Sequence, residues 1–479
     1  MTLPLDIRYR AYADWTESEI QKINENVKSS PWHPSYHIEA KTGLLNDPNG
    51  FSFFNGKYTL FYQNWPFGAA HGLKSWVHME SSDLVHFSET GTVLYPDTPN
   101  ESHGAYSGSA YEVNNKLFLL YTGNARDENF VRHPKLIGAW MDKDGNISKI
   151  EENLIQQPVD VTDHFRDPQI FNYMGQFYAI IGTQTLDKKG TITLYKSSDN
   201  DIKRWESLGK LNFGAKESEY MIECPNLVFV DGKPVLLYCP QGLDKKECTY
   251  ENIYPNTYVI CQSFDINNKK LKEPSPIQNL DYGFEAYATQ GFNTPDGRAL
   301  TVSWIGLPDI DYPTDQYDYQ GALSLVKELS LKNGKLYQYP VDTITNLRTK
   351  SKEFTSLSNS SNCYELELTF PANEKTEIIL FSDDEGKGLI FTVDTIEGSV
   401  ILDRRDAGIQ YATEFGTSRS CTIDKAETTA NIFVDNSIVE IFINKGEKVF
   451  TSRVFPDHHE SGIQIILGNP SGTFFELEH

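Results

Sequence analysis

The sequence predicts an all-β protein, a five-bladed β-propeller followed by a C-terminal antiparallel β-sandwich. The first observation is a repeat: between residues 55 and 298, five hairpin-type turns recur at nearly even spacing, and each is followed by a β-rich run. The second is a change of pattern near residue 340. Beyond it, short runs alternate apolar and polar residues with the period of two that half-buried strands have.

The five turns are built largely from asparagine, aspartate and glycine, which turns prefer. Taken at positions 56, 115, 175, 232 and 297, they are separated by 59, 60, 57 and 65 residues. This period exceeds the roughly 40–50 residues of common propeller repeats, and long loops would explain the excess. Five units of about four strands each predict five blades. A coincidental spacing, or a pair of β-sandwiches, is the alternative.

A polar side chain precedes each of the first four turns by eight or nine residues. Equivalent positions in successive blades lie on equivalent strands. If these strands are the innermost ones, the four side chains surround the mouth of one central channel, and residues far apart in the sequence share a pocket. The four residues are Asp47, Ser107, Asp167 and Glu223.

The same patterns predict the domain boundaries. Residues 1–30 form a lead-in with a short helix, because Thr16 and Glu19 make a capping box and Pro31 stops the helix. The remaining parts are the propeller (31–338), a connector with a short helical stretch (339–352) and the sandwich (353–479).

Composition narrows the function. The 479 residues carry a formal net charge of −23, which argues against nucleic acid or an anionic membrane as a partner, since both need basic faces. The first residues lack the apolar core of a signal peptide, and no run approaches the roughly 20 apolar residues of a transmembrane helix. Six cysteines without a Cys-x-x-Cys pair favour reduced thiols, with a Cys224–Cys239 disulfide as the minor alternative. These features predict a cytoplasmic protein.

No metal or cofactor is predicted. His33 and His37 have the i, i+4 spacing of a metal-binding pair, but Pro34 argues against a helix there. The sequence leaves the oligomeric state open.

Three carboxylates point to glycosidic chemistry. Retaining cleavage needs a carboxylate nucleophile and a carboxylic acid about 5–5.5 Å apart, and the acid must keep its proton near neutral pH. Glu223 lies among apolar neighbours, which suits a buried acid with a raised pKa. Asp47 is expected to be ionised and oriented by Asn46. Asp167 is expected to be ionised because Arg166 precedes it.

Seven short motifs occur in the order of a known family: Asn46-Asp47-Pro48-Asn49-Gly50, Phe61-Tyr62-Gln63, Tyr106-Ser107-Gly108-Ser109, Tyr121-Thr122-Gly123, Arg166-Asp167-Pro168, Glu223-Cys224-Pro225 and Ser303-Trp304-Ile305-Gly306. With them and a C-terminal signature at residues 435–442, nearly the whole chain resembles glycoside hydrolase family 32, the β-fructofuranosidases. The resemblance implies a propeller with a sandwich and retaining hydrolysis of terminal β-D-fructofuranosides without a cofactor. It also implies Asp47 as nucleophile, Glu223 as acid/base and Asp167 as transition-state stabiliser.

A second set of residues follows from the resemblance. His71 stands where many plant and extracellular members carry tryptophan, and the run from His71 to Lys74 is similar to bacterial intracellular members that act on sucrose 6-phosphate. His71 and Lys74, with Arg132 or His133 as further candidates, are expected to bind the phosphate by charge-assisted hydrogen bonds. The alternative for Lys74 is a solvated surface lysine. The predicted substrate-binding residues are Leu44, Leu45, Asn46, Gln63, His71, Lys74, Tyr106, Ser107, Arg166 and Trp304.

Three residues of the fifth repeat each allow two interpretations. Trp304 is expected to be a platform for the sugar ring, with a core position as the competing interpretation. Glu285 and Tyr287 either line the pocket or pack as ordinary strand residues. The function also has rivals: a fructan exohydrolase is the closest one, and a non-catalytic sugar-binding propeller is the rival from a different class.

Overall fold

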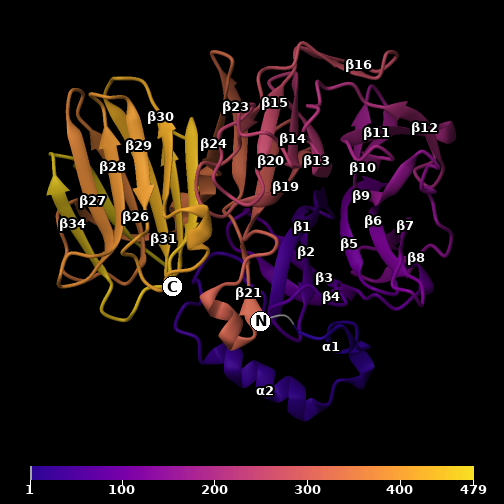
Figure 1. The fold of residues 1–479 in the computed structure, drawn as a ribbon, viewed down its shortest axis with the longest axis horizontal. Coiled ribbons are helices and arrows are strands. Elements are labelled where there is room, and N and C mark those ends of the chain that lie inside the picture. The colour runs from indigo at the N-terminus through magenta and orange to yellow at the C-terminus, as the bar shows by residue number, and fades with distance from the viewer. Residues whose placement is uncertain (1–2, 479) are drawn as a thin grey trace.

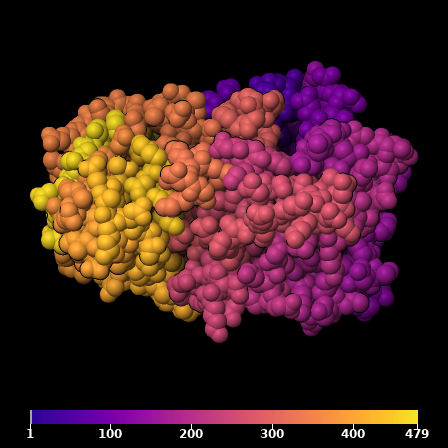
Figure 2. All heavy atoms as spheres, turned by 90° about the horizontal axis from the view of Figure 1, so that it is seen from above, coloured from indigo at the N-terminus to yellow at the C-terminus, as the bar shows by residue number. Residues whose placement is uncertain are grey.

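The computed structural model, which describes residues 3–478, contains two all-β modules side by side (Figure 1). Five sheets form the propeller, and two further sheets form the sandwich at the C-terminal end. The predicted order of a propeller followed by an antiparallel sandwich is confirmed. Figure 2 shows the two modules in continuous contact on the face seen from above.

Each blade is a sheet whose first strand lies innermost, and the inner strands β1, β5, β9, β13 and β19 contact one another around a ring. Blade 1 consists of β1 (Gly43–Phe54), β2 (Lys57–Trp65), β3 (Ser75–Ser81) and β4 (Ser88–Leu94), with β21 (Tyr319–Gln320) parallel to β1. Blade 2 consists of β5 (Ala105–Val113), β6 (Lys116–Arg126), β7 (Arg132–Met141) and β8 (Ile147–Lys149). Blade 3 consists of β9 (Val161–Tyr173), β10 (Gln176–Thr185), β11 (Gly190–Ser197) and β12 (Trp205–Lys210).

The last two blades are less regular. Blade 4 consists of β13 (Met221–Val230), β14 (Lys233–Gln241), β15 (Thr257–Ile260) and β18 (Gln278–Asn279), with β16 (Ser263–Asp265) and β17 (Lys270–Lys272) as a separate ribbon. Blade 5 consists of β19 (Tyr287–Asn293), β20 (Ala299–Ile305), β23 (Lys327–Lys332) and β24 (Lys335–Pro340), with β22 (Ala322–Leu323) against β20.

The sandwich stacks two antiparallel sheets. One contains β25 (Arg348–Glu353), β35 (Ser471–Leu477), β26 (Cys363–Phe370), β31 (Thr428–Asp435), β32 (Ile438–Ile443) and β33 (Lys448–Arg453). The other contains β30 (Ser418–Thr422), β29 (Ser399–Asp403), β28 (Leu389–Asp394), β27 (Lys375–Ser382) and β34 (Gly462–Leu467). The helices are α1 (Leu5–Arg8) and α2 (Glu17–Lys28), with short 3₁₀ turns η1 (Tyr12–Asp14), η2 (Pro99–Glu101), η3 (Ser198–Asn200), η4 (Pro313–Tyr317), η5 (Asp342–Leu347) and η6 (Thr413–Phe415).

Local sequence signals explain several of these elements. The capping box of Thr16 and Glu19 is present at the start of α2, as predicted. Each of the five predicted turns joins the first two strands of one blade. Turn residues such as Asn55 and Asn114 have φ of 52°, the left-handed region that asparagine tolerates better than most residues. Separate hydrophobic clusters fill the five interfaces between adjacent blades, so each blade is held by apolar burial on both faces.

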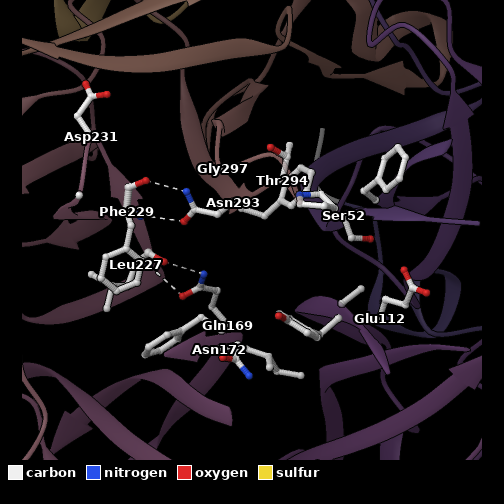
Figure 3. Close-up of a pocket in the computed structure, with 18 of the residues that line it drawn as sticks. Ser52, Glu112, Gln169, Asn172, Leu227, Phe229, Asp231, Asn293, Thr294 and Gly297 are labelled. Carbon is white, nitrogen blue, oxygen red and sulfur yellow. Dashed lines mark hydrogen bonds between the residues drawn. The ribbon is translucent and has the colours of Figure 1, made fainter. Parts of the chain in front are cut away.

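Side-chain amides link neighbouring inner strands where separate sheets meet. Gln169 on β9 accepts from the backbone N of Leu227 at 2.9 Å and donates to its O at 3.1 Å. Asn293 on β19 pairs in the same way with Phe229, at 2.8 and 2.7 Å (Figure 3). Each amide therefore makes the pair of hydrogen bonds that a backbone peptide group would make in a sheet, and so joins two blades.

The ring is closed by Gln290 on β19. It accepts from the N of Phe51 at 2.7 Å and donates to the O of Gly108 at 2.8 Å, so one side chain joins blades 5, 1 and 2. We call Gln169, Asn293 and Gln290 the amide layer. Beyond it, at the hairpin end of the ring, lies a cavity of about 760 Å³ lined by residues of all five inner strands (Figure 3). The amide layer separates this cavity from the predicted catalytic carboxylates.

The sandwich holds the segment that leads into β1. Asp435 accepts hydrogen bonds from the backbone N of Ser35 (2.6 Å), Tyr36 (3.0 Å) and His37 (2.9 Å). The His37 ring lies between two carboxylates, with Nδ1 2.9 Å from Asp435 and Nε2 3.1 Å from Glu440, and all three side chains are fully buried. The C-terminal signature is thus a clasp on the propeller, and His37 takes part in it rather than in a metal pair with His33.

The structure also bears on three further predictions, for the cysteines, for membrane-spanning helices and for Glu285. The six thiols are free and buried, so Cys224 and Cys239 are not joined. Within residues 3–478, no helix has the length and apolar content needed to cross a membrane. Glu285 accepts from Arg404 at 3.0 Å and from the Tyr411 hydroxyl at 2.6 Å, so it lies at the contact with the sandwich and not in the pocket.

Candidate active site

All five inner strands are bulged at the same level of the ring. The pairing register shifts at Asn46-Asp47, Tyr106-Ser107, Asp167-Pro168, Cys224-Pro225 and Ala288-Thr289. A bulge bends the strand and re-aims side chains, which here lie at the channel mouth. Proline cannot donate to a ladder, so the Asp-Pro and Cys-Pro steps were the sequence signal for these bulges.

Three donors fix the Asp47 carboxylate. Asn46 Nδ2 donates to Oδ1 at 3.0 Å, as predicted, and Gln63 Nε2 donates to Oδ2 at 3.2 Å. The Ser107 hydroxyl, from the next blade, also donates to Oδ2. The side chain is therefore oriented by residues from two blades.

The Glu223 carboxylate also accepts hydrogen bonds from three donors. Arg166 Nη2 donates to Oε1 at 2.7 Å, whereas Gln241 Nε2 (2.7 Å) and the Tyr287 hydroxyl (2.6 Å) donate to Oε2. Burial raises the pKa of Glu223, but the charge of Arg166 and these hydrogen bonds outweigh it, and the pKa is lowered. The expectation of a raised pKa is thus wrong for the unliganded site, because the guanidinium pairs with Glu223.

Asp167 behaves in the opposite way. It accepts from the backbone N of Cys224 at 3.0 Å, but Arg166 Nε stays 3.9 Å away. Burial raises its pKa to about 7, helped by the charges of Glu223 and Asp47 and opposed by Arg166. The expectation that Asp167 is fully ionised is therefore wrong near neutral pH.

Sequence reasoning missed Gln241 altogether and left Tyr287 undecided. Gln241 lies on β14, opposite Met221 in the register, and no local motif marks it. Tyr287 belongs to the pocket, since its hydroxyl reaches Glu223. The Cys224 thiol lies 3.8 Å from Asp47 Oδ2 and 3.6 Å from Asp167 Oδ2, so it fills the space between two carboxylates.

Three predicted sugar-binding residues lie in the core. Leu44 and Leu45 are 0% exposed and pack in the cluster between blades 5 and 1, so their side chains offer no surface to a sugar. Trp304 is 1% exposed and therefore has no open ring face for stacking, which corrects the platform prediction. Its ring lies 6.3 Å from that of His71 and 6.4 Å from that of Tyr287.

Lys74 is a buried cation beside the carboxylates. It is 2% exposed, which excludes the solvated surface lysine. Burial lowers the pKa of Lys74 to about 8; Arg8 adds to this effect, whereas Asp47, Glu223 and Asp167 oppose it. The ammonium group lies over the ring of Tyr106, 5.1 Å from its centroid. In the described part of the chain, no carboxylate forms an ion pair with it.

The other phosphate candidates differ. Burial, with the charges of Lys74 and Arg8, holds the pKa of His71 well below its ordinary value. A neutral imidazole can still donate to an anionic phosphate, so the predicted phosphate contact of His71 stays a prediction. Arg132 is half-buried, and its Nε has no hydrogen-bond partner among the described residues. His133 is exposed and lies 3.0 Å from Asp127.

Within residues 3–478, one group of side chains could hold a metal ion: Asp457, His458 and His459. This group is exposed in the loop between β33 and β34 and is not part of the candidate site. The channel mouth instead holds three carboxylates with separate partners, and two of them, Glu223 and Asp167, have pKa values shifted in opposite directions. This is the equipment of a glycosidase, in which one carboxylate attacks and another exchanges protons.

Comparisons with known proteins agree with this class. The sequence model of the glycosyl hydrolases family 32 N-terminal domain matches residues 37–340, and that of the family 32 C-terminal domain matches residues 334–478. The chain belongs to glycosyl hydrolase family 32 and is a glycoside hydrolase.

Relatives match over full length. The sucrose-6-phosphate hydrolase of Streptococcus mutans is 67% identical over 479 residues, covering 100% of both chains, and that of Lactococcus lactis is 48% identical, covering 95% of this chain and 96% of the other. The solved sucrose-6-phosphate hydrolase of Lactobacillus gasseri has a TM-score of 0.96 at 42% identity, covering 100% and 99%. A Bombyx mori family 32 β-fructofuranosidase has a TM-score of 0.84 at 29% identity, covering 97% and 99%.

Proposed function

We propose that the protein is a retaining β-fructofuranosidase that removes terminal non-reducing β-D-fructofuranosyl units, with sucrose 6-phosphate as the preferred substrate and sucrose as a second one. The observation that carries the proposal is a buried cation, Lys74, beside three carboxylates. Lys74 has no acidic ion-pair partner within residues 3–478, and Arg132 Nε has no hydrogen-bond partner there. A buried charge without a partner is costly, so such a site favours an anionic ligand.

In the proposed mechanism, Glu223 protonates the glycosidic oxygen while Asp47 attacks the anomeric carbon of fructose. Water, deprotonated by Glu223, then hydrolyses the fructosyl-enzyme and releases fructose. The donors around Asp47 hold its carboxylate for attack. Asp167 would bind fructose hydroxyls and strengthen these bonds as positive charge develops on the ring.

The first step requires a protonated Glu223, although Arg166 keeps its pKa low in the unliganded site. The resemblance assigns Arg166 to fructose. Fructose hydroxyls that accept from the guanidinium would compete with Glu223 for it, which raises the pKa of Glu223 when substrate is bound. Asn46 Oδ1 is buried without a hydrogen-bond partner in the described chain and is a free acceptor for another sugar hydroxyl.

The substrate assignment is supported by the relatives. Those from Streptococcus mutans and Lactococcus lactis are named for hydrolysis of sucrose 6-phosphate, and a Bombyx mori β-fructofuranosidase has been solved in complex with sucrose. The phosphate of sucrose 6-phosphate is on the glucose, so its site must lie beyond the fructose pocket. Six free thiols fit a reducing compartment, which supports a cytoplasmic location that cell fractionation can test.

The test compares kcat/KM on sucrose 6-phosphate and sucrose for wild type and Lys74→Ala. The variant should lose about 10- to 100-fold on the phosphorylated substrate, as expected for one charge-assisted hydrogen bond, and much less on sucrose. Lys41→Ala is the matched control, because Lys41 is an exposed lysine paired with Glu89. Equal loss on both substrates would refute the phosphate role of Lys74. Release of fructose from inulin or levan at comparable rates would favour the fructan exohydrolase.

Azide distinguishes the two catalytic roles. Asp47→Ala and Glu223→Ala should each lower turnover by at least about 10²–10⁴-fold with the fold retained. Azide needs no general base, so it should intercept the fructosyl-enzyme of Glu223→Ala and give fructosyl azide with retained configuration from a substrate with an activated leaving group. Asp47→Ala cannot form that intermediate and should give no retained product. Normal rates in either variant would overturn the assignment.

A further inference from the structure

The N-terminal lead-in is bonded to the loop that carries Lys74. Arg8 Nε donates to the O of His71 at 2.6 Å, and the N of Leu73 donates to the O of Arg8 at 2.7 Å. The Tyr12 hydroxyl donates to the O of Leu73 at 3.0 Å. The lead-in is therefore part of the wall of the site, although it precedes the first strand of the propeller in the sequence.

The guanidinium of Arg8 has donors to spare. Only its Nε has a hydrogen-bond partner in the part of the chain that the structure describes, and no carboxylate there forms an ion pair with it. Arg10, two residues later, is fully engaged: Nη1 lies 2.8 Å from Glu19 Oε1 and Nη2 lies 3.0 Å from Oε2. The lead-in thus contains one arginine that is paired with a carboxylate, Arg10, and one that is not, Arg8.

Arg8 lies beside the loop that carries Lys74, because it bonds to the O of His71 and to the N of Leu73. The charge of Arg8 lowers the pKa of Lys74, whereas those of Asp47 and Glu223 raise it. Tyr106 lies next to the same cations: burial raises its pKa to about 12, while Arg8 is among the charges that lower it. Arg8, Lys74 and Tyr106 are therefore neighbours, and Lys74 lies close enough to the three carboxylates to feel their charge.

We infer that Arg8 is a specificity-determining residue, whose free guanidinium nitrogens bind the phosphate on the glucose unit together with Lys74. This inference rests on the proposed function. A guanidinium presents donors in a fork that matches two phosphate oxygens, and its bond to the O of His71 already fixes its orientation. A ligand phosphate would supply the negative charge that no residue among 3–478 supplies to Arg8.

The experiment measures kcat and KM on sucrose 6-phosphate and on sucrose for Arg8→Gln, Arg8→Lys and Arg10→Gln, with inhibition by inorganic phosphate as a second readout. Arg8→Gln should lower kcat/KM on sucrose 6-phosphate about 10- to 100-fold, mainly through KM, and weaken phosphate inhibition to a similar extent. Activity on sucrose should change less than about 3-fold, because sucrose has no group for Arg8. Arg8→Lys keeps the charge and should lose less than Arg8→Gln.

The outcomes distinguish a failure of the inference about Arg8 from a failure of the proposed substrate. Equal losses of Arg8→Gln on both substrates would show that Arg8 only tethers residues 71–75, and would overturn the inference. The same selective loss in Arg10→Gln would also overturn it, since that residue pairs with Glu19 instead. If the kcat/KM of wild type on sucrose equals that on sucrose 6-phosphate, the proposed preference for the phosphorylated substrate fails. If wild type prefers the phosphorylated sugar but Arg8→Gln keeps that preference, only the inference fails.

Discussion

The Arg166 guanidinium donates from Nη2 to Oε1 of Glu223 at 2.7 Å, although the two residues lie 57 positions apart in the sequence and on different blades. Its Nε is 3.9 Å from the carboxylate of Asp167, its neighbour in the chain. Arg166 thus lowers the pKa of Glu223, whereas burial raises that of Asp167 despite the same guanidinium. Glu223 has a lowered pKa, and Asp167 has a pKa of about 7.

Replacing Arg166 by glutamine should shift the pH dependence of catalysis. Loss of the positive charge raises the pKa of Glu223, so the acid form persists to higher pH and the basic limb of the kcat/KM profile should move upward. The rate should fall by about 10²-fold or more, because a donor to the sugar is also lost. A profile measured from pH 4 to 9 checks this. A basic limb that stays in place would show that Arg166 does not control the protonation of Glu223.

Tyr287→Phe should act on the same carboxylate more gently. The hydroxyl donates to Glu223 Oε2 at 2.6 Å, so its loss raises the pKa of Glu223 and should move the basic limb of the pH profile upward. The loss of a donor that orients the carboxyl group should lower kcat about 3- to 30-fold. Gln241→Met removes the other donor to that oxygen and should move the basic limb in the same direction. Tyr254→Phe is the control, because that hydroxyl bonds to Asp309 and its loss should leave the profile unchanged.

Stability should depend on pH through His37. Burial alone would lower its pKa, but the hydrogen bonds to Asp435 and Glu440 outweigh this and raise it to about 9. Since the folded-state pKa lies above the unfolded value of about 6.5, the stabilisation is fully present below pH 6.5 and is lost as pH rises through about 9. The free energy of unfolding should fall by about 3 kcal/mol over this window.

His37→Gln provides the check on that window. Urea unfolding at pH 6 and pH 9 should show a smaller difference between the two pH values than wild type does, and lower stability at pH 6. His86→Gln is the matched control, since His86 is exposed and pairs with Asp83 at the surface. An unchanged difference in His37→Gln would mean that another group causes the pH dependence.

The hydrogen bonds of the amide layer should contribute measurably to the free energy of unfolding. Gln169→Leu leaves the backbone N and O of Leu227 without the partners that join blades 3 and 4, and should cost about 1–3 kcal/mol in the free energy of unfolding. Gln21→Leu is the control, because Gln21 bonds only to Glu25 on the exposed face of α2. Equal stability of Gln169→Leu and wild type would show that apolar packing alone holds these blades together.

The fold was largely predictable because its signals are local. Turn residues and the apolar runs after them identify each hairpin without knowledge of the rest of the chain. The period of the hairpins then predicts that Asp47 and Glu223 share the channel mouth, and both lie on inner strands as expected. The bulges in these strands were not predicted. Ring closure by Gln290 was not predictable, because an isolated glutamine in a strand has no distinctive context.

The electrostatics of the site were predicted incorrectly for a physical reason. Sequence neighbours suggested that Arg166 pairs with Asp167, but the bulge turns these two side chains differently, and the blade geometry brings Glu223 to the guanidinium. Gln241 and Arg8 were missed because both reach the site from segments without a motif. Burial of Leu45 and Trp304 likewise depends on how blade 5 packs against blade 1.

The clasp at Asp435 has a consequence for biosynthesis. The segment it holds leads into β1, the first strand of the propeller and the one with Asp47, yet Asp435 leaves the ribosome 400 residues after Ser35. Residues 35–37 must therefore wait for the sandwich before they are anchored. A chain that stops before residue 435 lacks this anchor for the segment that leads into the strand with Asp47.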